Sequence, residues 1–317
     1  MRFPRPLRQG GCVGLICPSS PVQPERMDRC VKFLCRLGYR VKEGKSCRMA
    51  WRGYLAGPDE VRAEDINRMF ADPEVDAVFC VRGGNGTCRI MTLLDYEMIR
   101  RNPKIFVGYS DVTNLLLAFN RLCGFVTYHG PMVSSNMADH YDEYTRLSFE
   151  GLLAMKNEWE FRNPPGMPPV VLTAGAARGQ LTGGNLSLVS DMLGTFYMPD
   201  FRGKILFLED IGERVANVDR MLWQLRHLGV FEQIAGLVFG DFADSVNNYD
   251  ESFGINSYLR DEFCRMNIPV LCGLKAGHCF PTGSLAMGAE CELDADRGTL
   301  RFFREQEKDC AVWGNVV

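Results

Sequence analysis

The segment 104–117 constrains the fold more than any other part of this sequence. It begins with a short apolar run, continues through a turn that carries Ser110, and ends in a second apolar run. A buried strand, a tight turn and a helix in this order place the serine at the edge of a sheet, which is the geometry of a nucleophile elbow. Gly108 and Ser110 match the pattern G-x-S-x-G, but Val112 stands where the second glycine is expected.

A simpler interpretation of the same segment is an ordinary capped helix. Ser110 and Asp111 are both good N-cap residues, and capped strand-to-helix turns are common in α/β folds. The segment by itself is compatible with both interpretations, so the rest of the chain has to decide between them.

Strand and helix signals alternate through the first half of the chain. Strands 13–17 and 75–81 are almost entirely apolar, as expected for parallel strands covered on both faces. Helices are expected at 25–37 and 63–70 because their apolar residues recur at helical spacing. This alternation predicts a doubly wound parallel sheet that carries the serine elbow.

A proline-rich stretch interrupts the alternation at 161–170, where four prolines fall within six residues. We take it as a linker between an N-terminal domain, 1–160, and a smaller mixed α/β domain, 171–317. The second domain is expected to hold four strands and a helix capped by Asn217. They are placed at 204–208, 237–239, 291–293 and 299–303, with the helix at 218–228.

The composition limits the classes of partner. The net charge is −3, which gives no reason to expect nucleic acid or an anionic membrane as a partner. No apolar run is long enough to span a bilayer, and we expect no signal peptide. None of the thirteen cysteines forms a C-x-x-C pair, so we expect reduced thiols, no metal and no other cofactor. Reduced thiols favour a cytoplasmic location.

The glycine turn 83–86 follows a strand, so its backbone N–H groups could approach an anion closely. Its spacing fails the dinucleotide pattern G-x-G-x-x-G, and no G-K-[ST] follows as in a P-loop. An anion-binding or oxyanion-binding turn and a plain tight turn both remain possible.

A hydrolytic serine needs a base, and four histidines are available. His227 lies in the last turn of a helix, where the helix dipole explains a cation, and His140 lies in a polar loop. His129 ends an apolar strand, and His278 lies in a glycine-rich loop of the kind that carries function. His129 and His278 are equally good candidates on these grounds.

The base needs a carboxylate to orient it. Glu209 directly follows an apolar strand and is the acid best placed to point inward, whereas we expect Glu213 at the surface.

Six motifs together resemble the LD-carboxypeptidase family of serine peptidases, which includes the microcin C immunity peptidases. They occur in one order on both sides of the proline-rich stretch. The motifs are Arg82-Gly83-Gly84-Asn85-Gly86, Gly108-Tyr109-Ser110-Asp111, His129-Gly130-Pro131-Met132, Leu181-Thr182-Gly183-Gly184-Asn185-Leu186, Leu208-Glu209-Asp210-Ile211-Gly212-Glu213 with Asp219-Arg220-Met221-Leu222, and Gly277-His278.

The resemblance implies a triad in which Ser110 is the nucleophile, His278 the base and Glu209 its orienting acid. It also implies an oxyanion hole, which we map to the backbone amides of Gly84 and Asp111.

For the terminal carboxylate of a substrate we select Arg82 and Asn185 as binding residues. Many family members carry an aromatic residue in place of Asn85, which concerns the shape of the substrate pocket.

By resemblance, the activity is hydrolysis of the bond between an L-configured centre and a terminal D-alanine in muropeptides, by a homodimer. The alternative within the family is hydrolysis of a peptidyl- or aminoacyl-nucleotide. Members of that type tend to carry a longer, tryptophan-bearing loop near the site, with no clear equivalent here. Outside the family, a non-catalytic binding protein and a nucleotide-dependent oxidoreductase remain alternatives.

Overall fold

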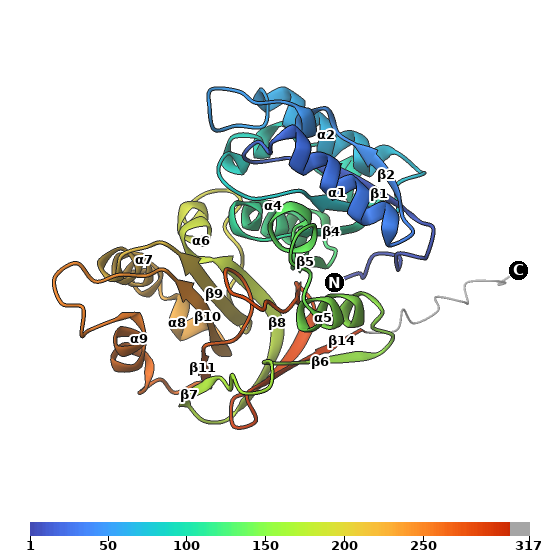
Figure 1. The fold of residues 1–317 in the computed structure, drawn as a ribbon. Coiled ribbons are helices and arrows are strands. Elements are labelled where there is room, and N and C mark those ends of the chain that lie inside the picture. Colours follow the sequence, from blue (N-terminus) through green and yellow to red (C-terminus); the bar gives the residue numbers. More distant parts are fainter. Residues whose placement is uncertain (305–317) are drawn as a thin grey trace, which may run out of the picture.

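The chain forms two β-sheets with helices packed against them, and the computed structural model describes residues 1–304 (Figure 1). The predicted domain 171–317 therefore ends in residues, 305–317, that lie outside the described part. The helices are α1(Pro24–Arg36), α2(Asp59–Ala71), α3(Tyr96–Arg101), α4(Thr113–Ala118), α5(Glu143–Leu153), α6(Leu186–Met192), α7(Val215–His227), α8(Val230–Gln233) and α9(Ile255–Phe263).

The first sheet has six strands, of which five are parallel, as the alternation predicted. The sixth, β12, comes from late in the chain and runs antiparallel to β5. In spatial order the strands are β12(Leu285–Met287), β5(Thr127–His129), β4(Ile105–Gly108), β3(Ala77–Cys80), β1(Cys12–Ile16) and β2(Arg40–Glu43).

The second sheet has eight strands and is mixed. Its centre, β8 to β11, is parallel, and the strands on both sides are antiparallel. In spatial order they are β6(Glu158–Arg162), β14(Thr299–Phe303), β13(Glu290–Asp294), β8(Ala176–Asn185), β9(Ile205–Ile211), β10(Gly236–Ala243), β11(Val270–Cys272) and β7(Val170–Thr173). The predicted hairpin between β13 and β14 is confirmed.

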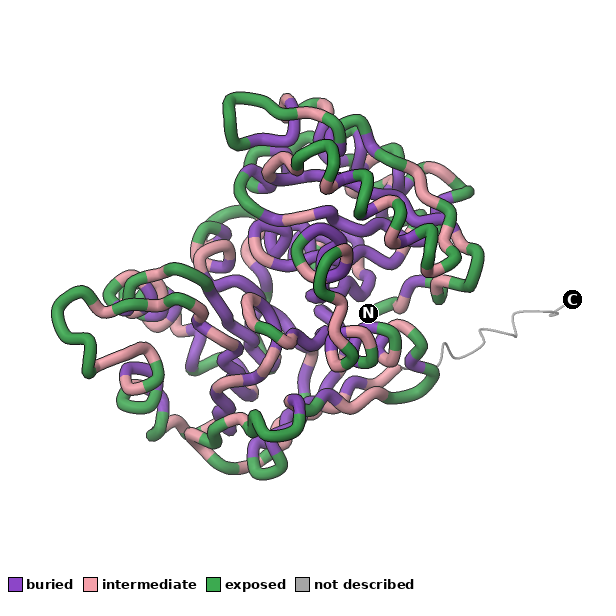
Figure 2. Tube along the Cα trace, in the orientation of Figure 1, coloured by how far each residue is buried: buried purple, intermediate pink, exposed green. Residues whose placement is uncertain are grey.

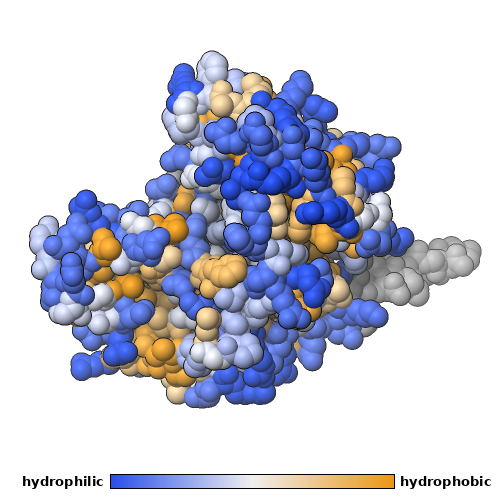
Figure 3. Space-filling view, viewed as in Figure 1, coloured by the Kyte–Doolittle hydropathy of each residue, from blue (hydrophilic) through white to orange (hydrophobic). Residues whose placement is uncertain are grey.

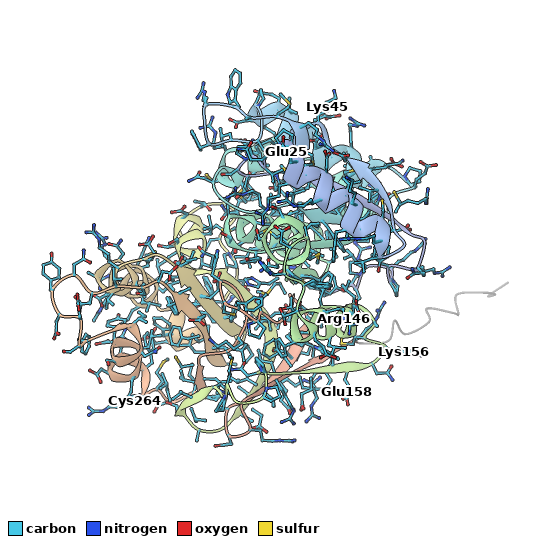
Figure 4. The ribbon with its side chains drawn as sticks, in the orientation of Figure 1. Glu25, Lys45, Arg146, Lys156, Glu158 and Cys264 are labelled. Carbon is cyan, nitrogen blue, oxygen red and sulfur yellow. The ribbon has the colours of Figure 1, made fainter. Side chains whose placement is uncertain are left out.

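Two strands each lie in the sheet that is built mainly from the other half of the chain. β6, which precedes the prolines, pairs with β14 in the second sheet, and β12 returns to the first sheet. Figure 4 labels Arg146 on α5 and Glu158 on β6, the elements that lead from the first sheet to the second. The predicted domain boundaries stay predictions. One apolar core contains residues of both sheets. The buried residues lie along the strands of both sheets (Figure 2).

After the glycine turn the chain forms two short 3₁₀ helices, η2(Thr87–Arg89) and η3(Met91–Leu93), before α3. One local prediction was wrong. The predicted cap Asn217 lies inside α7, which begins after Arg214. Val215 and Val218 are both buried, so the helix starts early enough to place both in the core, and Asn217 bonds to Glu213 instead.

The visible face is mainly hydrophilic, with apolar side chains in scattered patches (Figure 3). Among residues 1–304, no helix combines the length and the apolar character needed to cross a membrane.

Candidate active site

Ser110 follows β4 with a backbone conformation that an L-residue rarely adopts, φ +62°. It opens the 3₁₀ turn η4(Ser110–Val112), which leads directly into α4. Such strain at the turn between a strand and a helix is typical of a nucleophile elbow, and the role of Ser110 stays a prediction. Val112 replaces the second glycine of G-x-S-x-G, and its side chain packs against Gly108, where a Cβ would lie 2.7 Å from Cγ1 of Val112. Glycine is thus required at 108, while 112 accepts a side chain.

The glycine turn lies directly against this serine. A Cβ on Gly83 would come within 3.1 Å of Ser110 Oγ, so only a bare backbone fits there. Gly84 has φ +126°, and neither its N–H nor that of Asp111 makes a hydrogen bond within residues 1–304. Two unpaired N–H groups near a serine suit an oxyanion, and the oxyanion-binding role of both residues stays a prediction.

The side chain of Asp111 connects the elbow to the glycine turn. Its carboxylate accepts the backbone N–H of Thr87 at 3.0 Å, while the Thr87 hydroxyl donates to the carbonyl of Asp111 at 2.6 Å. Asn114 donates to the same hydroxyl at 3.2 Å. Burial raises the pKa of Asp111, although these hydrogen bonds act in the opposite direction.

Glu209 and His278 meet at the carboxyl end of β9. Nδ1 of His278 lies 2.7 Å from Oε2 of Glu209, and the backbone N–H of His278 donates to the same oxygen at 3.0 Å. Glu209 is fully buried, whereas the side chain of His278 remains 13% exposed. Two glycines make room for the carboxylate, because a Cβ on Gly240 would lie 2.8 Å from Cβ of Glu209 and one on Gly277 would collide with its carboxyl group.

The environment of His278 suits a general base. Burial favours the neutral imidazole and lowers the pKa of His278, but the hydrogen bond and charge of Glu209 outweigh burial and raise that pKa above its ordinary value. Because Nδ1 is engaged with Glu209, Nε2 is the ring nitrogen left to exchange a proton with a substrate or nucleophile.

His129 has a different environment, which separates the two candidate bases. It is fully buried on β5, neither ring nitrogen has a partner among the described residues, and its ring packs edge-on against Phe207 at 5.2 Å. Burial, aided by the charge of His278, lowers the pKa of His129 to about 3. His140 and His227 are exposed, as expected for a loop and a helix end.

Tyr109 joins the two halves of the site. Its ring lies edge-on to the imidazole of His278, with centroids 4.9 Å apart, and Ser110 is the next residue in the chain. The residue before Ser110, just past the end of β4, thus contacts the imidazole of the Glu209–His278 pair.

The two predicted carboxylate-binding residues are engaged within the protein. Arg82 is half-buried and donates to the carbonyls of Gly83 and Pro21 at 3.2 and 3.3 Å. The buried side chain of Asn185 caps α6 and donates to Asp210 at 2.9 Å. Contact with a substrate would require the Asn185 side chain to give up one of these bonds, so its proposed role stays a prediction.

Two residues that contact the glycine turn, Arg62 and Ser20, were not predicted from the sequence. Arg62 is completely buried on α2 and bonds to the glycine turn, and Ser20 accepts the N–H of Asn85 at 3.2 Å. A usable signal was present for Arg62, because it lies at helical spacing with the apolar residues Ile66 and Met69 on the buried face.

No group of three or more His, Cys, Asp or Glu side chains within the described residues is arranged to hold a metal ion.

Comparison with known proteins identifies the family. Residues 13–130 match the LD-carboxypeptidase N-terminal domain, and residues 178–293 match the LD-carboxypeptidase C-terminal domain. The probable murein peptide carboxypeptidase of Bacillus subtilis (strain 168) is 40% identical over 299 residues, which cover 93% of this chain and 92% of that protein.

Solved structures of two kinds share the fold. The muramoyltetrapeptide carboxypeptidase from Oxalobacter formigenes has a TM-score of 0.81 at 31% identity, over 92% of this chain and 99% of that one. The microcin C7 self immunity protein MccF, in complex with aspartyl sulfamoyl adenosine, has a TM-score of 0.89 at 25% identity, over 95% and 98% of the two chains. Two matched domains in order and a relative of this similarity establish that the chain belongs to the LD-carboxypeptidase family of peptidases.

Proposed function

We propose that this protein is a serine carboxypeptidase that removes the terminal D-alanine from murein tetrapeptides by cutting the bond after an L-configured diaminopimelate or lysine. The observation that carries the proposal is the buried Glu209–His278 pair beside a serine held at φ +62°. The 40% identity to a probable murein peptide carboxypeptidase supports this substrate class.

The reaction follows from the geometry in two steps. His278, oriented by Glu209, takes the proton of the Ser110 hydroxyl as its oxygen attacks the carbonyl carbon of the L-residue. The N–H groups of Gly84 and Asp111 stabilise the oxyanion, and His278 passes its proton to the departing amine of D-alanine. Water, deprotonated by His278, then attacks the acyl-enzyme and restores the serine.

The protein acts in the cytoplasm in this proposal. The cysteines of the described part are all free, which suits a reducing compartment. A homodimer, as the resemblance implies, is proposed on that basis alone.

The decisive experiment incubates the protein with a tetrapeptide that ends in L-diaminopimelyl-D-alanine and follows free D-alanine by mass spectrometry. Ser110→Ala serves as the control. The likeness to MccF favours the alternative substrate, an aminoacyl-nucleotide, which is assayed in parallel. Hydrolysis of the nucleotide conjugate alone would replace the murein substrate by the immunity-type one.

A further inference from the structure

Arg62 has an unusual environment for a charged side chain. It is among the largest fully buried side chains of the protein, and its guanidinium bonds to backbone carbonyls of three separate loops. Nε donates to Gly57 at 3.1 Å, and Nη1 donates to Pro18 at 2.5 Å and to Gly86 at 2.9 Å. Asp59, one turn earlier on α2, supplies the counter-charge. A buried cation is costly unless it is paired and hydrogen-bonded, and this one is paired with Asp59 and makes four hydrogen bonds.

The bond to Gly86 fixes one particular peptide group. The carbonyl of Gly86 and the N–H of Thr87 belong to the same planar peptide unit. Arg62 holds this unit at its oxygen, and the carboxylate of Asp111 holds it at its nitrogen, at 3.0 Å. The backbone N–H of Arg89 also donates to the Gly86 carbonyl, at 3.3 Å, so the unit cannot rotate unless at least one of these hydrogen bonds breaks.

This peptide unit lies between Arg62 and the nucleophile. Asp111 is the residue after Ser110, and Gly84 lies two residues before Gly86. On the other side of the turn, Ser20 packs against Gly84 and accepts the N–H of Asn85. The loop that carries Ser20 is itself held by Arg62 through the carbonyl of Pro18. Arg62 thus holds both loops that fix the position of Gly84.

We propose that Arg62 is a positioning residue that sets the backbone N–H of Gly84 relative to Ser110, so that the oxyanion hole is formed before substrate binds. This inference rests on the proposed function for the roles of Ser110 and Gly84. Gly86 accommodates the contact, because a Cβ there would lie 2.9 Å from Nη1 of Arg62. A planar group with several fixed donors is required, and only arginine offers one.

Loss of Arg62 should weaken the stabilisation of the transition state more than the binding of the substrate. Arg62 is buried behind the turn, so its loss should leave substrate affinity nearly intact while a displaced N–H stabilises the oxyanion less well. A misplacement on the order of 1 Å can cost about 100-fold in rate. Arg62→Met should therefore lower kcat by about 10- to 100-fold and change KM by less than about threefold.

Arg89 offers a matched control. It bonds to the same carboxylate of Asp59, at 2.6 Å, but its side chain is 40% exposed and makes no hydrogen bond to the glycine turn in the described structure. Arg89 reaches the turn only through its backbone N–H, which donates to the carbonyl of Gly86 at 3.3 Å and is kept in Arg89→Met. Arg89→Met removes an arginine from Asp59 and should leave kcat unchanged. Arg62→Lys keeps the buried charge but offers no planar fork, and it should restore only part of the rate.

The test measures two rates for each variant, together with its thermal unfolding. One is turnover of the tetrapeptide, and the other is covalent labelling of Ser110 by a fluorophosphonate, whose adduct also places an oxygen in the oxyanion hole. Labelling does not depend on the natural substrate, so it tests the role of Arg62 even if wild-type protein leaves the tetrapeptide intact. Wild-type protein that is not labelled at Ser110 would instead contradict the proposed function.

The expected result is slow labelling and low kcat in Arg62→Met and Arg62→Lys, with Arg89→Met at the wild-type rate. If Arg62→Met does not fold, Arg62→Lys and Asp59→Asn, which weakens the anchoring of Arg62, decide the question. Folded Arg62 variants that are labelled within twofold of the wild-type rate would overturn the proposal. A loss shown equally by Arg89→Met would also overturn it.

Discussion

One carboxylate oxygen of Glu209 accepts two hydrogen bonds from the same residue. Oε2 lies 2.7 Å from Nδ1 of His278 and 3.0 Å from its backbone nitrogen. The backbone bond fixes the loop and the ring bond fixes the imidazole, so the base is oriented from two points. A ring held in this way presents Nε2 in one direction, as a general base requires.

Replacement of Glu209 by glutamine should shift the pH profile to lower pH. Glu209 raises the pKa of His278, and only the neutral imidazole can accept a proton from Ser110. Without the carboxylate charge, burial dominates and the pKa of His278 falls, so the acidic limb of kcat/KM moves downward. The rate itself should fall by about 10⁴-fold, as the orientation and tautomer of the ring are lost. Glu213→Gln is the control, because Glu213 bonds only to Asn217 among the described residues.

Ser110→Ala should lower kcat by about 10⁴-fold or more while the protein remains folded. Alanine has the same backbone strain as serine at φ +62°, so the substitution should not change that strain. Ser110 Oγ makes no hydrogen bond within residues 1–304, so no stabilising bond is lost. Turnover and circular dichroism on the same sample check both statements. Near-wild-type turnover would remove Ser110 as the nucleophile.

His129 should contribute to stability rather than to catalysis. The unfolded chain binds a proton at this residue below about pH 6.5, whereas burial holds the pKa of His129 at about 3 in the folded protein. The unfolded state therefore binds more protons between these values, and stability falls as pH drops from about 6.5 toward 3.

His129→Phe removes this group and should flatten the decline of Tm between about pH 7 and 4 relative to wild type. Its activity should stay far above that of His278→Ala. The opposite order of the two variants would make His129 the base.

The sequence indicates the residues of the candidate site more directly than it indicates how strands pair between distant parts of the chain. Strands such as β3 and β4 are marked by local apolar runs, and Ser110, Glu209 and His278 lie in or beside short recognisable motifs. The return of β12 to the first sheet depends on pairing with β5, which lies far away in the chain, and no local periodicity records such a pair. Asn185 was selected as a donor to the substrate carboxylate, and no local pattern indicated that its side chain would also cap α6 and bond to Asp210.

Arg62 shows the same limit on a smaller scale. A helical arginine usually lies at the surface. The spacing of Arg62 with Ile66 and Met69 indicates a buried face, but the carbonyls that it binds become evident only when the loops are placed together.

Removal of divalent metal should leave activity unchanged. The proposed reaction uses only Ser110, His278, Glu209 and backbone amides, and none of these steps needs a Lewis acid. Turnover of the tetrapeptide before and after treatment with a chelator checks this expectation. A loss of activity that Zn²⁺ or another divalent ion restores would contradict it.

The free carboxylate of the terminal D-alanine should be required. A carboxypeptidase reads a chain end through cationic or donor-rich groups near the oxyanion site, and the remaining donors of Arg82 lie beside the glycine turn. Amidation of the D-alanine should therefore sharply reduce kcat/KM, whereas truncation at the far end of the peptide should matter less. Equal rates on acid and amide would favour a general amidase or the immunity-type activity.

Gly277→Ala should inactivate the enzyme through Glu209. Gly277 has φ +98°, and a Cβ there would collide with the carboxyl group of Glu209, which is fully buried. The matched control is Gly273→Ala. Gly273 lies in the same loop with φ +77°, but a Cβ there meets nothing within 4 Å.

Gly277→Ala and Gly273→Ala should each lower the free energy of unfolding by about 1–2 kcal/mol through backbone strain. Only Gly277→Ala should displace the carboxylate, lower kcat by about 100-fold or more, and shift the acidic limb in the same direction as Glu209→Gln. Equal activity of the two variants, measured at matched folded fractions, would show that the position of Glu209 does not control the base.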